Sequence, residues 1–472
     1  MMAGMVSEES RTTMSTPSVR TPAASAPPAP ATRAWPQRML VFGIVLAALN
    51  LRPAITSLGA LLEEVRDGLG MSGGVAGLLT SVPPLCFAVF GVTAPRLARR
   101  FGPGAVVCAG MAAITAGLLL RPYVGGTAGF LAASALALMG IAVSNVLMPV
   151  IVKRHFPDRV GSMTGLYSMA LALGTAGAAA VTVPVTEALG GRWQSGLAVW
   201  AGLAAVAVVP WTPFVWQRQR QRPRQRQRDA GPAGEAAARD PRSSGEAPAR
   251  VGRSSGEAPA LLDRPADRAS AAGHHPPAVR ITRSRTAWAL AVFFGLQATA
   301  AYITMGWMAQ IFRDAGVPAS TAGLLLAVTM VMGVPLAFVI PRVAARLPRQ
   351  GPIVLVLSAC GLAGYAGLYL APAAGAWAWA LLLGVANCAF PLALTMVGMR
   401  ARTGAGVAQL SAFAQSTGYL ISIPGPLLVG VLYQSSGGWG VPLALMAGLM
   451  VPQTVVGILA GRDRTVEDEA AR

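Results

Sequence analysis

Long runs of apolar residues, separated by short polar breaks, dominate the chain. They form two sets of six, and a strongly polar stretch lies between the sets. The runs fall near residues 39–61, 74–94, 104–121, 128–152, 162–186 and 195–216, and then near 287–311, 321–340, 352–371, 375–399, 407–432 and 441–460. A helix needs about 20 mostly apolar residues to cross a bilayer. The pattern therefore predicts an all-α integral membrane protein with twelve transmembrane helices.

The same pattern divides the chain into five parts. Two six-helix bundles are expected over 38–216 and 287–461, with a linker at 217–286 and tails at 1–37 and 462–472. The first tail is rich in Ser, Thr, Pro and Ala, and the linker contains a tandem duplication of RSSGEAPA. Neither segment offers an apolar face that could pack, so we predict that both are disordered.

Composition narrows the class of protein. The 472 residues are 54% hydrophobic and 12% charged, with a mean hydropathy of +0.53. Soluble domains carry about 25% charged residues, so an ordinary cytosolic enzyme is excluded. The four cysteines lie inside apolar runs without metal-ligand spacing, and no histidine lies inside a run. We expect no metal, no cofactor and no enzymatic activity.

Basic residues in the short loops predict the orientation. The loops on the side of the N-terminus hold Arg96, Arg99, Arg100, Lys153, Arg154, Arg159, Arg342, Arg346, Arg349, Arg400 and Arg402. The opposite loops hold only Arg66, Arg121, Arg192 and Arg313. Cytoplasmic loops carry the excess of Lys and Arg. We therefore expect a multi-pass protein of the plasma (inner) membrane with both termini and the linker in the cytoplasm.

The formal net charge of +19 invites a nucleic-acid interpretation, which the distribution of charge disfavours. The linker holds 15 arginines against seven acidic residues but no stacking aromatic residues, so we expect no nucleic-acid partner. Attraction to anionic inner-leaflet lipids is one interpretation, at about 1 kcal/mol per basic residue near the surface. A solvated tether that also fixes the topology is the interpretation we favour.

The two halves of the chain share sequence. AGLL at 76–79 and PRLARR at 95–100 match AGLL at 322–325 and PRVAAR at 341–346, both at an offset of 246 residues. Three further residues match at an offset of 242, namely Val143, Asn145 and Pro149 with Val385, Asn387 and Pro391. A duplicated six-helix unit is typical of transporters that bind their substrate between the halves.

These motifs resemble the major facilitator superfamily, and within it the cyanate and 2-nitroimidazole transporter family of bacteria. The resemblance rests on NLRPAITSLGALLEEVR (50–66), AGLLTSVPPLCF (76–87), APRLARRFG (94–102), VLMPVIVKRHF (146–156), GLYSMALALG (165–174) and GLQ (295–297). It implies two pseudo-symmetric bundles that work by alternating access. The chain departs from the superfamily's loop motif, because Pro95 stands in place of its Asp and Ala98 in place of its second Gly. Any gate contact that needs this carboxylate is therefore in doubt.

Arg52 is the first candidate for substrate binding. It lies inside the first apolar run, where a charge costs about 2.5–3.5 kcal/mol and is by default a functional hypothesis. Pro53 disfavours helical geometry at Arg52, and Thr56 shares a helical face with it. The planar guanidinium suits a small anion or a carboxylate, which it can bind with two hydrogen bonds. The alternative is an arginine that bonds to backbone carbonyls and only stabilises the fold.

Polar residues in other runs are further candidates. Asn145 and Asn387 each stand four residues before a proline, so each is expected at a kink. Gln297 and Tyr302 lie in the seventh run and Gln415 in the eleventh, on spans that we expect to line a cavity. Hydrogen bonding between helices is the alternative for the two asparagines, at about 0.6–2 kcal/mol. Packing is the alternative for the other three residues.

The arginines at the helix ends on the predicted cytoplasmic side are candidate gating residues. They are Arg96, Arg99, Arg100, Arg342 and Arg346. Their symmetric placement favours contacts with helix ends or acidic groups of the opposite half. The alternative is that they only determine the topology.

The sequence thus predicts a secondary transporter of a small solute. By the resemblance, the substrate is cyanate-like, 2-nitroimidazole-like or a small carboxylate. The alternatives are an exporter of small hydrophobic or cationic compounds, and a membrane scaffold or sensor that acts through its Arg-rich linker. Protons are a candidate coupling ion, and coupling is expected to run through the substrate's own charge or through Glu63, Glu64 or Glu187. We expect a monomer.

Overall fold

The structure, a computed structural model, describes residues 34–214 and 281–470. Within these residues every regular element is a helix, and twelve helical segments are long and apolar enough to cross a membrane. This confirms the twelve predicted spans. Disorder was predicted for the first tail and the linker. Apart from the last few residues of each, these two segments lie outside the described residues.

The first six spans form one bundle. Its helices are α1 (Ala34–Asn50), α2 (Pro53–Ala60), α3 (Leu62–Leu69), α4 (Gly73–Phe101), α5 (Pro103–Leu120), α6 (Thr127–His155), α7 (Val160–Ala188) and α8 (Trp193–Val208), with the short 3-10 turns η2 (Arg121–Tyr123), η3 (Pro157–Arg159) and η4 (Val209–Trp211). The first span consists of α1 and α2 together, and α3 is an amphipathic helix outside it.

The last six spans form the second bundle. Its helices are α11 (Arg285–Asp314), α12 (Ala319–Val331), α13 (Gly333–Arg346), α14 (Gly351–Leu370), α15 (Ala376–Asn387), α16 (Ala389–Met399), α17 (Gly404–Ser422), α18 (Pro424–Ser436) and α19 (Gly440–Ala460), with η6 (Ile281–Arg283) before them and α20 (Val466–Ala470) after them. Three of these spans are interrupted, so that α12 and α13, α15 and α16, and α17 and α18 each make one span.

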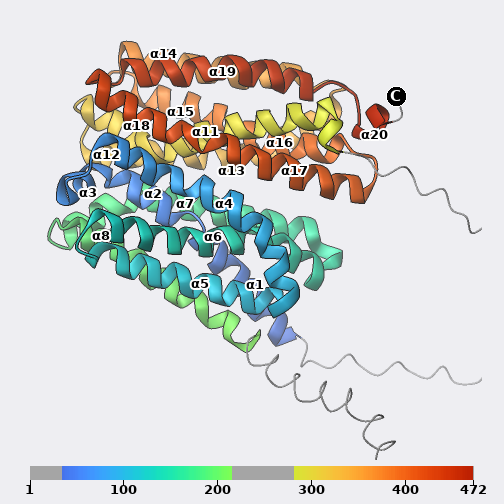
Figure 1. The fold of residues 1–472 in the computed structure, drawn as a ribbon, viewed down its shortest axis with the longest axis horizontal. Helices are drawn as coiled ribbons and strands as arrows, with labels where there is room; N and C mark the ends of the chain where they lie inside the picture. Colours follow the sequence, from blue (N-terminus) through green and yellow to red (C-terminus); the bar gives the residue numbers. More distant parts are fainter. Residues whose placement is uncertain (1–33, 215–280, 471–472) are drawn as a thin grey trace, which may run out of the picture.

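The two bundles lie side by side, and the start of α1 and the C-terminal α20 lie toward the same end of them (Figure 1). We call this the termini end, and the opposite end, which carries α3, the distal end. The termini end also holds Phe101, His155 and Arg346, and the distal end holds Leu69, Ala188, Asp314 and Ser436.

Small residues bring the bundles into close contact over their distal halves. A Cβ atom on Gly77 of α4 would lie only 2.8 Å from the carbonyl oxygen of Leu427 on α18. Gly59 of α2 approaches the backbone of Met305 on α11 in the same way. The helix α7 packs closely on α12 but little on α13, which continues toward the termini end. The bundles are therefore closed against each other at the distal end.

The segment after the last span, predicted as a tail, is docked on the second bundle. The carboxylate of Glu469 accepts hydrogen bonds from the hydroxyls of Ser284 and Thr286 at the start of α11, at 2.6 and 2.7 Å. Asp468 pairs with Arg402 in the turn before α17, at 2.5 Å. These contacts tie α20 to two spans that are far apart in the sequence.

Candidate functional site

The first span is broken at Arg52. The helix α1 ends at Asn50 and α2 begins at Pro53, which cannot donate a backbone hydrogen bond. Arg52 itself has φ −127° and ψ −27°, so its backbone is outside the helical range at the break. The sequence predicted this loss of helical geometry before Pro53.

The guanidinium of Arg52 is surrounded by aromatic residues from both bundles. It interacts electrostatically with the hydroxyl groups of Tyr302 on α11, Tyr167 on α7 and Tyr419 on α17. Its central carbon lies 5.8 Å from the ring centroid of Phe87 on α4, within the range of a cation–π contact. Within the described residues, no ion pair joins Arg52 to a carboxylate. The positive charge is thus available to a ligand.

The aromatic residues continue as a packed series. The rings of Phe87 and Tyr419 stack with centroids 5.1 Å apart across the interface between bundles. Tyr419 also packs edge-on against Phe294, at 5.2 Å, and Phe294 lies 5.5 Å from Phe390. Side chains of both bundles therefore surround one charged group, which is the arrangement expected of a site that opens to alternate sides.

Asn145 is connected to this site through Tyr167. The hydroxyl of Tyr167 donates to the amide oxygen of Asn145 at 2.6 Å. The helix α6 stays continuous through Pro149, so the kink predicted at Asn145 is not seen as a break.

Gln297 and Asn387 form a separate cluster inside the second bundle. The amide nitrogen of Gln297 donates to both the backbone and the side-chain oxygen of Asn387, each at 2.9 Å. Gln453 in turn donates to Gln297 at 3.1 Å. The span is broken at Cys388, and Pro391 leaves the carbonyl of Asn387 without a helical donor. Gln297 satisfies that carbonyl. The structure shows these two residues bonded to each other rather than to Arg52.

Two further predicted binding residues are engaged within their own helices. The hydroxyl of Thr56, which is fully buried, donates to the carbonyl of Arg52 at 3.3 Å. The amide nitrogen of Gln415 donates to Ser411 at 2.7 Å.

The predicted gating arginines lie at the termini end, and two of them bond within their own helices. Arg96 donates to Val92 on its own helix and Arg342 to Phe338, one turn earlier in each case. Arg100 lies over the ring of Phe101, its own neighbour. Arg99 and Arg346 are exposed at the termini end.

Cross-bundle ion pairs lie instead at the distal end. Arg313 at the end of α11 contacts Glu63 and Glu64 on α3, each at 2.9 Å. The guanidinium of Arg66 lies 5.8 Å from the ring centroid of Tyr433 on α18, which adds a second contact between the bundles. We call the ion pairs of Arg313 with Glu63 and Glu64 the distal latch.

Arg121, which the sequence placed in a loop, is buried with 2% of its surface exposed. It donates to the carbonyl of Ala54 at 2.9 Å and to the hydroxyl of Ser57 at 3.3 Å. Both acceptors lie on α2, so Arg121 fixes the short helix that follows the break at Arg52.

The sequence missed Tyr167 and Phe87 and did not connect Tyr419 with Arg52. The small number of tyrosines was a usable signal, because the chain has only seven and three of them lie near Arg52. Within the described residues, no group of three or more His, Cys, Asp or Glu side chains could hold a metal ion.

In the described residues, twelve candidate spans in two bundles, with an arginine between the bundles, are the architecture of a membrane transporter. The sequence profile of the Major Facilitator Superfamily matches residues 40–421, and the chain belongs to this family.

Relatives agree with this assignment over nearly the whole chain. An uncharacterized transporter of Bacillus subtilis, YycB, is 31% identical over 90% of this chain and 94% of its own. The 2-nitroimidazole transporter of Escherichia coli is 30% identical, over 91% and 96%. The cyanate transport protein CynX of Escherichia coli is 27% identical, over 86% and 94%. The crystal structure of the nucleoside transporter NupG shares the fold, with a TM-score of 0.63 at 14% identity over 90% of this chain and 98% of that one.

Proposed function

We propose that this protein carries a small anion or a nitroaromatic compound across the plasma membrane, and that Arg52 binds it. The observation that supports this most is the guanidinium of Arg52 at the bundle interface, which has tyrosine hydroxyls around it and no ion pair with a carboxylate in the described residues. At such a site the N–H groups of the guanidinium take the place of the water that hydrates an ion in solution. Because N–H groups donate charge-assisted hydrogen bonds, the site favours a negative ion.

The surrounding groups fit such a ligand. Tyr302 lies close enough to Arg52 to interact with its charge, and its phenolic O–H can donate to an anion bound there. The stacked rings of Phe87 and Tyr419 offer an apolar surface to a flat aromatic ring. Cyanate-like ions and small carboxylates match the first feature and nitroimidazoles the second, and two of the relatives carry 2-nitroimidazole or cyanate in their names.

The transport cycle follows from the closed distal end. If the termini end is cytoplasmic, as the loop charges predict, the closed distal end faces away from the cytoplasm. In the opposite state the distal latch breaks, and Arg96, Arg99, Arg100, Arg342 and Arg346 make their contacts at the termini end. Protons remain the coupling ion that we would test first.

A second candidate is an exporter of neutral aromatic or cationic compounds, which the series of Phe and Tyr rings favours. Arg52 distinguishes the candidates, because a buried positive charge repels cations.

Flux into proteoliposomes tests the proposal, with cyanate, benzoate, 2-nitroimidazole and tetraphenylphosphonium as probes and with or without a pH gradient. We expect Arg52→Gln to abolish anion flux and to spare or improve cation flux. Arg192→Gln, which removes an exposed charge at the distal end, is the control. Equal anion flux in Arg52→Gln and the wild type would contradict the proposal.

A further inference from the structure

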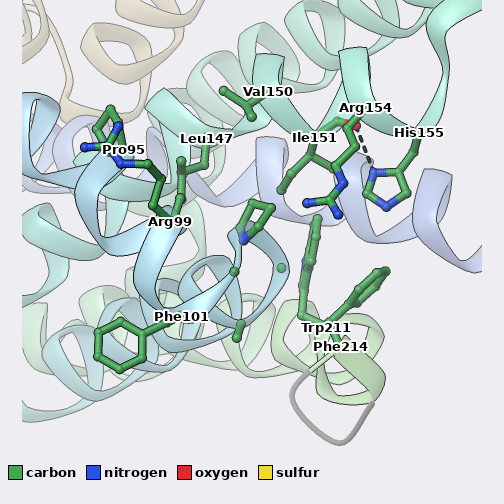
Figure 2. A pocket seen from close by; sticks show the side chains of 15 residues that line it. Pro95, Arg99, Phe101, Leu147, Val150, Ile151, Arg154, His155, Trp211 and Phe214 are labelled. Carbon is green, nitrogen blue, oxygen red and sulfur yellow. Dashed lines mark hydrogen bonds between the residues drawn. The ribbon is translucent and has the colours of Figure 1, made fainter. Parts of the chain in front are cut away.

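A pocket of about 700 Å³ lies at the termini end of the first bundle, away from Arg52. The ends of α4 and α6, the start of α5 and the turn η4 form its walls. Figure 2 shows Arg154 and His155 on one side of it, Arg99 on the other, and Trp211 and Phe214 beneath. Its volume lies within the range of about 300–1,000 Å³ typical of small-molecule sites.

One part of the pocket is basic and unpaired. Arg99 and Arg154 are both exposed, and neither has a hydrogen bond or ion pair with any residue in the described part of the chain. His155 donates from Nδ1 to the carbonyl of Ile151 at 3.0 Å, which leaves its Nε2 free. The first turn of α5 also borders the pocket, and no side chain caps its N–H groups.

Another part of the pocket is apolar and exposed. Phe101 and Val150 line it and are 40% and 49% exposed. Trp211 and Phe214 pack together with ring centroids 5.7 Å apart. An apolar rim beside unpaired guanidinium groups suits an amphiphile whose charged end is an anion.

We propose that this pocket binds the phosphate-bearing headgroup of an anionic phospholipid. Guanidinium groups bind phosphate through charge-assisted hydrogen bonds, and basic pockets between transmembrane helices bind anionic lipid headgroups. The position fits, because the pocket lies where the helices end and where headgroups meet the protein. Arg154 and Arg99 contact the phosphate, and the acyl chains leave over Phe101 and Val150.

Native mass spectrometry of the full chain, titrated with phosphatidylglycerol or phosphatidylcholine, tests this proposal. We expect Arg99→Gln/Arg154→Gln to bind phosphatidylglycerol about a hundredfold more weakly, at about tenfold per lost arginine contact. The matched control is Arg342→Gln/Arg346→Gln, which removes the same charge at the same end of the second bundle. It should bind the lipid like the wild type. Circular dichroism verifies that all variants are folded.

Three results would overturn the proposal. The first is equal lipid binding by the Arg99→Gln/Arg154→Gln variant and the wild type. The second is equal weakening in the control, which would indicate non-specific charge attraction. The third is equal binding of phosphatidylcholine. In a separate arm, displacement of the lipid by inorganic phosphate at an equal concentration would identify a soluble phosphate compound as the ligand and overturn the lipid assignment.

Discussion

The guanidinium of Arg52 and the hydroxyl of Tyr302 interact electrostatically, although the two residues belong to different bundles. An anion that binds Arg52 competes with Tyr302 for this guanidinium. Binding therefore changes a contact that holds the two halves together, which is the property that a site for alternating access requires.

Loss of the Tyr302 hydroxyl should weaken substrate binding without abolishing it. A hydrogen bond to a charged group contributes about 1.5–3 kcal/mol, and Phe keeps the ring. We expect Tyr302→Phe to raise the KM for anion flux by about tenfold or more. Tyr365→Phe is the matched control, because Tyr365 is buried inside the second bundle away from Arg52. An unchanged KM in Tyr302→Phe would show that the hydroxyl does not contact the substrate.

Breaking the distal latch should shift the conformational equilibrium. Each partly exposed ion pair of Arg313 contributes about 0.2–1 kcal/mol, so Glu63→Gln/Glu64→Gln should raise the ratio of distal-open to distal-closed molecules by about two- to thirtyfold. Spin labels at Asp67→Cys and Ser435→Cys, in a chain whose four native cysteines are replaced, measure this ratio as a distance distribution.

Glu187→Gln is the control for the latch, because Glu187 is exposed at the distal end and makes no ion pair in the described residues. A distance distribution that is the same in the latch variant and in this control would show that the ion pairs do not hold the distal end closed.

A larger side chain at Gly77 should prevent distal closure. Any Cβ atom there would lie 2.8 Å from the carbonyl oxygen of Leu427, a backbone atom that cannot move alone. We expect Gly77→Leu to fold and to reach the membrane. It should lose about 90% of its flux or more, because the larger side chain overpacks the contact with α18 that distal closure requires. Gly74→Leu, with no atom within 3.7 Å of the new Cβ, is the control on the same helix. Full flux in Gly77→Leu would contradict the close approach of α4 and α18.

Docking of α20 should depend on pH. Partial burial raises the pKa of Glu469, but hydrogen bonds from Ser284 and Thr286 outweigh it and lower the pKa below its ordinary value of 4.5. The docked state is therefore stabilised fully above about pH 4.5 and loses this stabilisation as the pH falls through the lowered pKa. Glu469→Gln should speed deuterium exchange at the amide of Thr286, which donates to the carboxylate at 3.2 Å. Exchange equal to that of the wild type would contradict the docking.

The repeating apolar pattern was enough to predict twelve spans and the break before Pro53, because both depend on local physical chemistry. Tyr302 was predicted as a polar residue of a cavity, and the structure brings it to Arg52. The positions of Tyr167 and Tyr419 could not be predicted from the sequence, because only the packing of α7 and α17 around the first span places their hydroxyls near Arg52.

Charge in the sequence predicted an orientation, but it did not predict the partners of individual arginines. Arg121 and Arg400 count as loop residues by position, yet both are 2% exposed. Arg400 donates to Gln350 and to the carbonyl of Ala460, so it joins three spans of the second bundle. The pairing of Arg313 with Glu63 and Glu64 spans about half of the chain and has no local signal.

The most direct test of the account is equilibrium binding of benzoate and 2-nitroimidazole to the purified full chain, by isothermal titration calorimetry, with the wild type, Arg52→Gln and Arg192→Gln. We predict that the wild type and Arg192→Gln bind at least one of the two probes with equal affinity, and that Arg52→Gln binds that probe at least about a hundredfold more weakly, which corresponds to about 2.7 kcal/mol. Equal affinity of Arg52→Gln and the wild type would contradict the central claim that Arg52 binds the substrate.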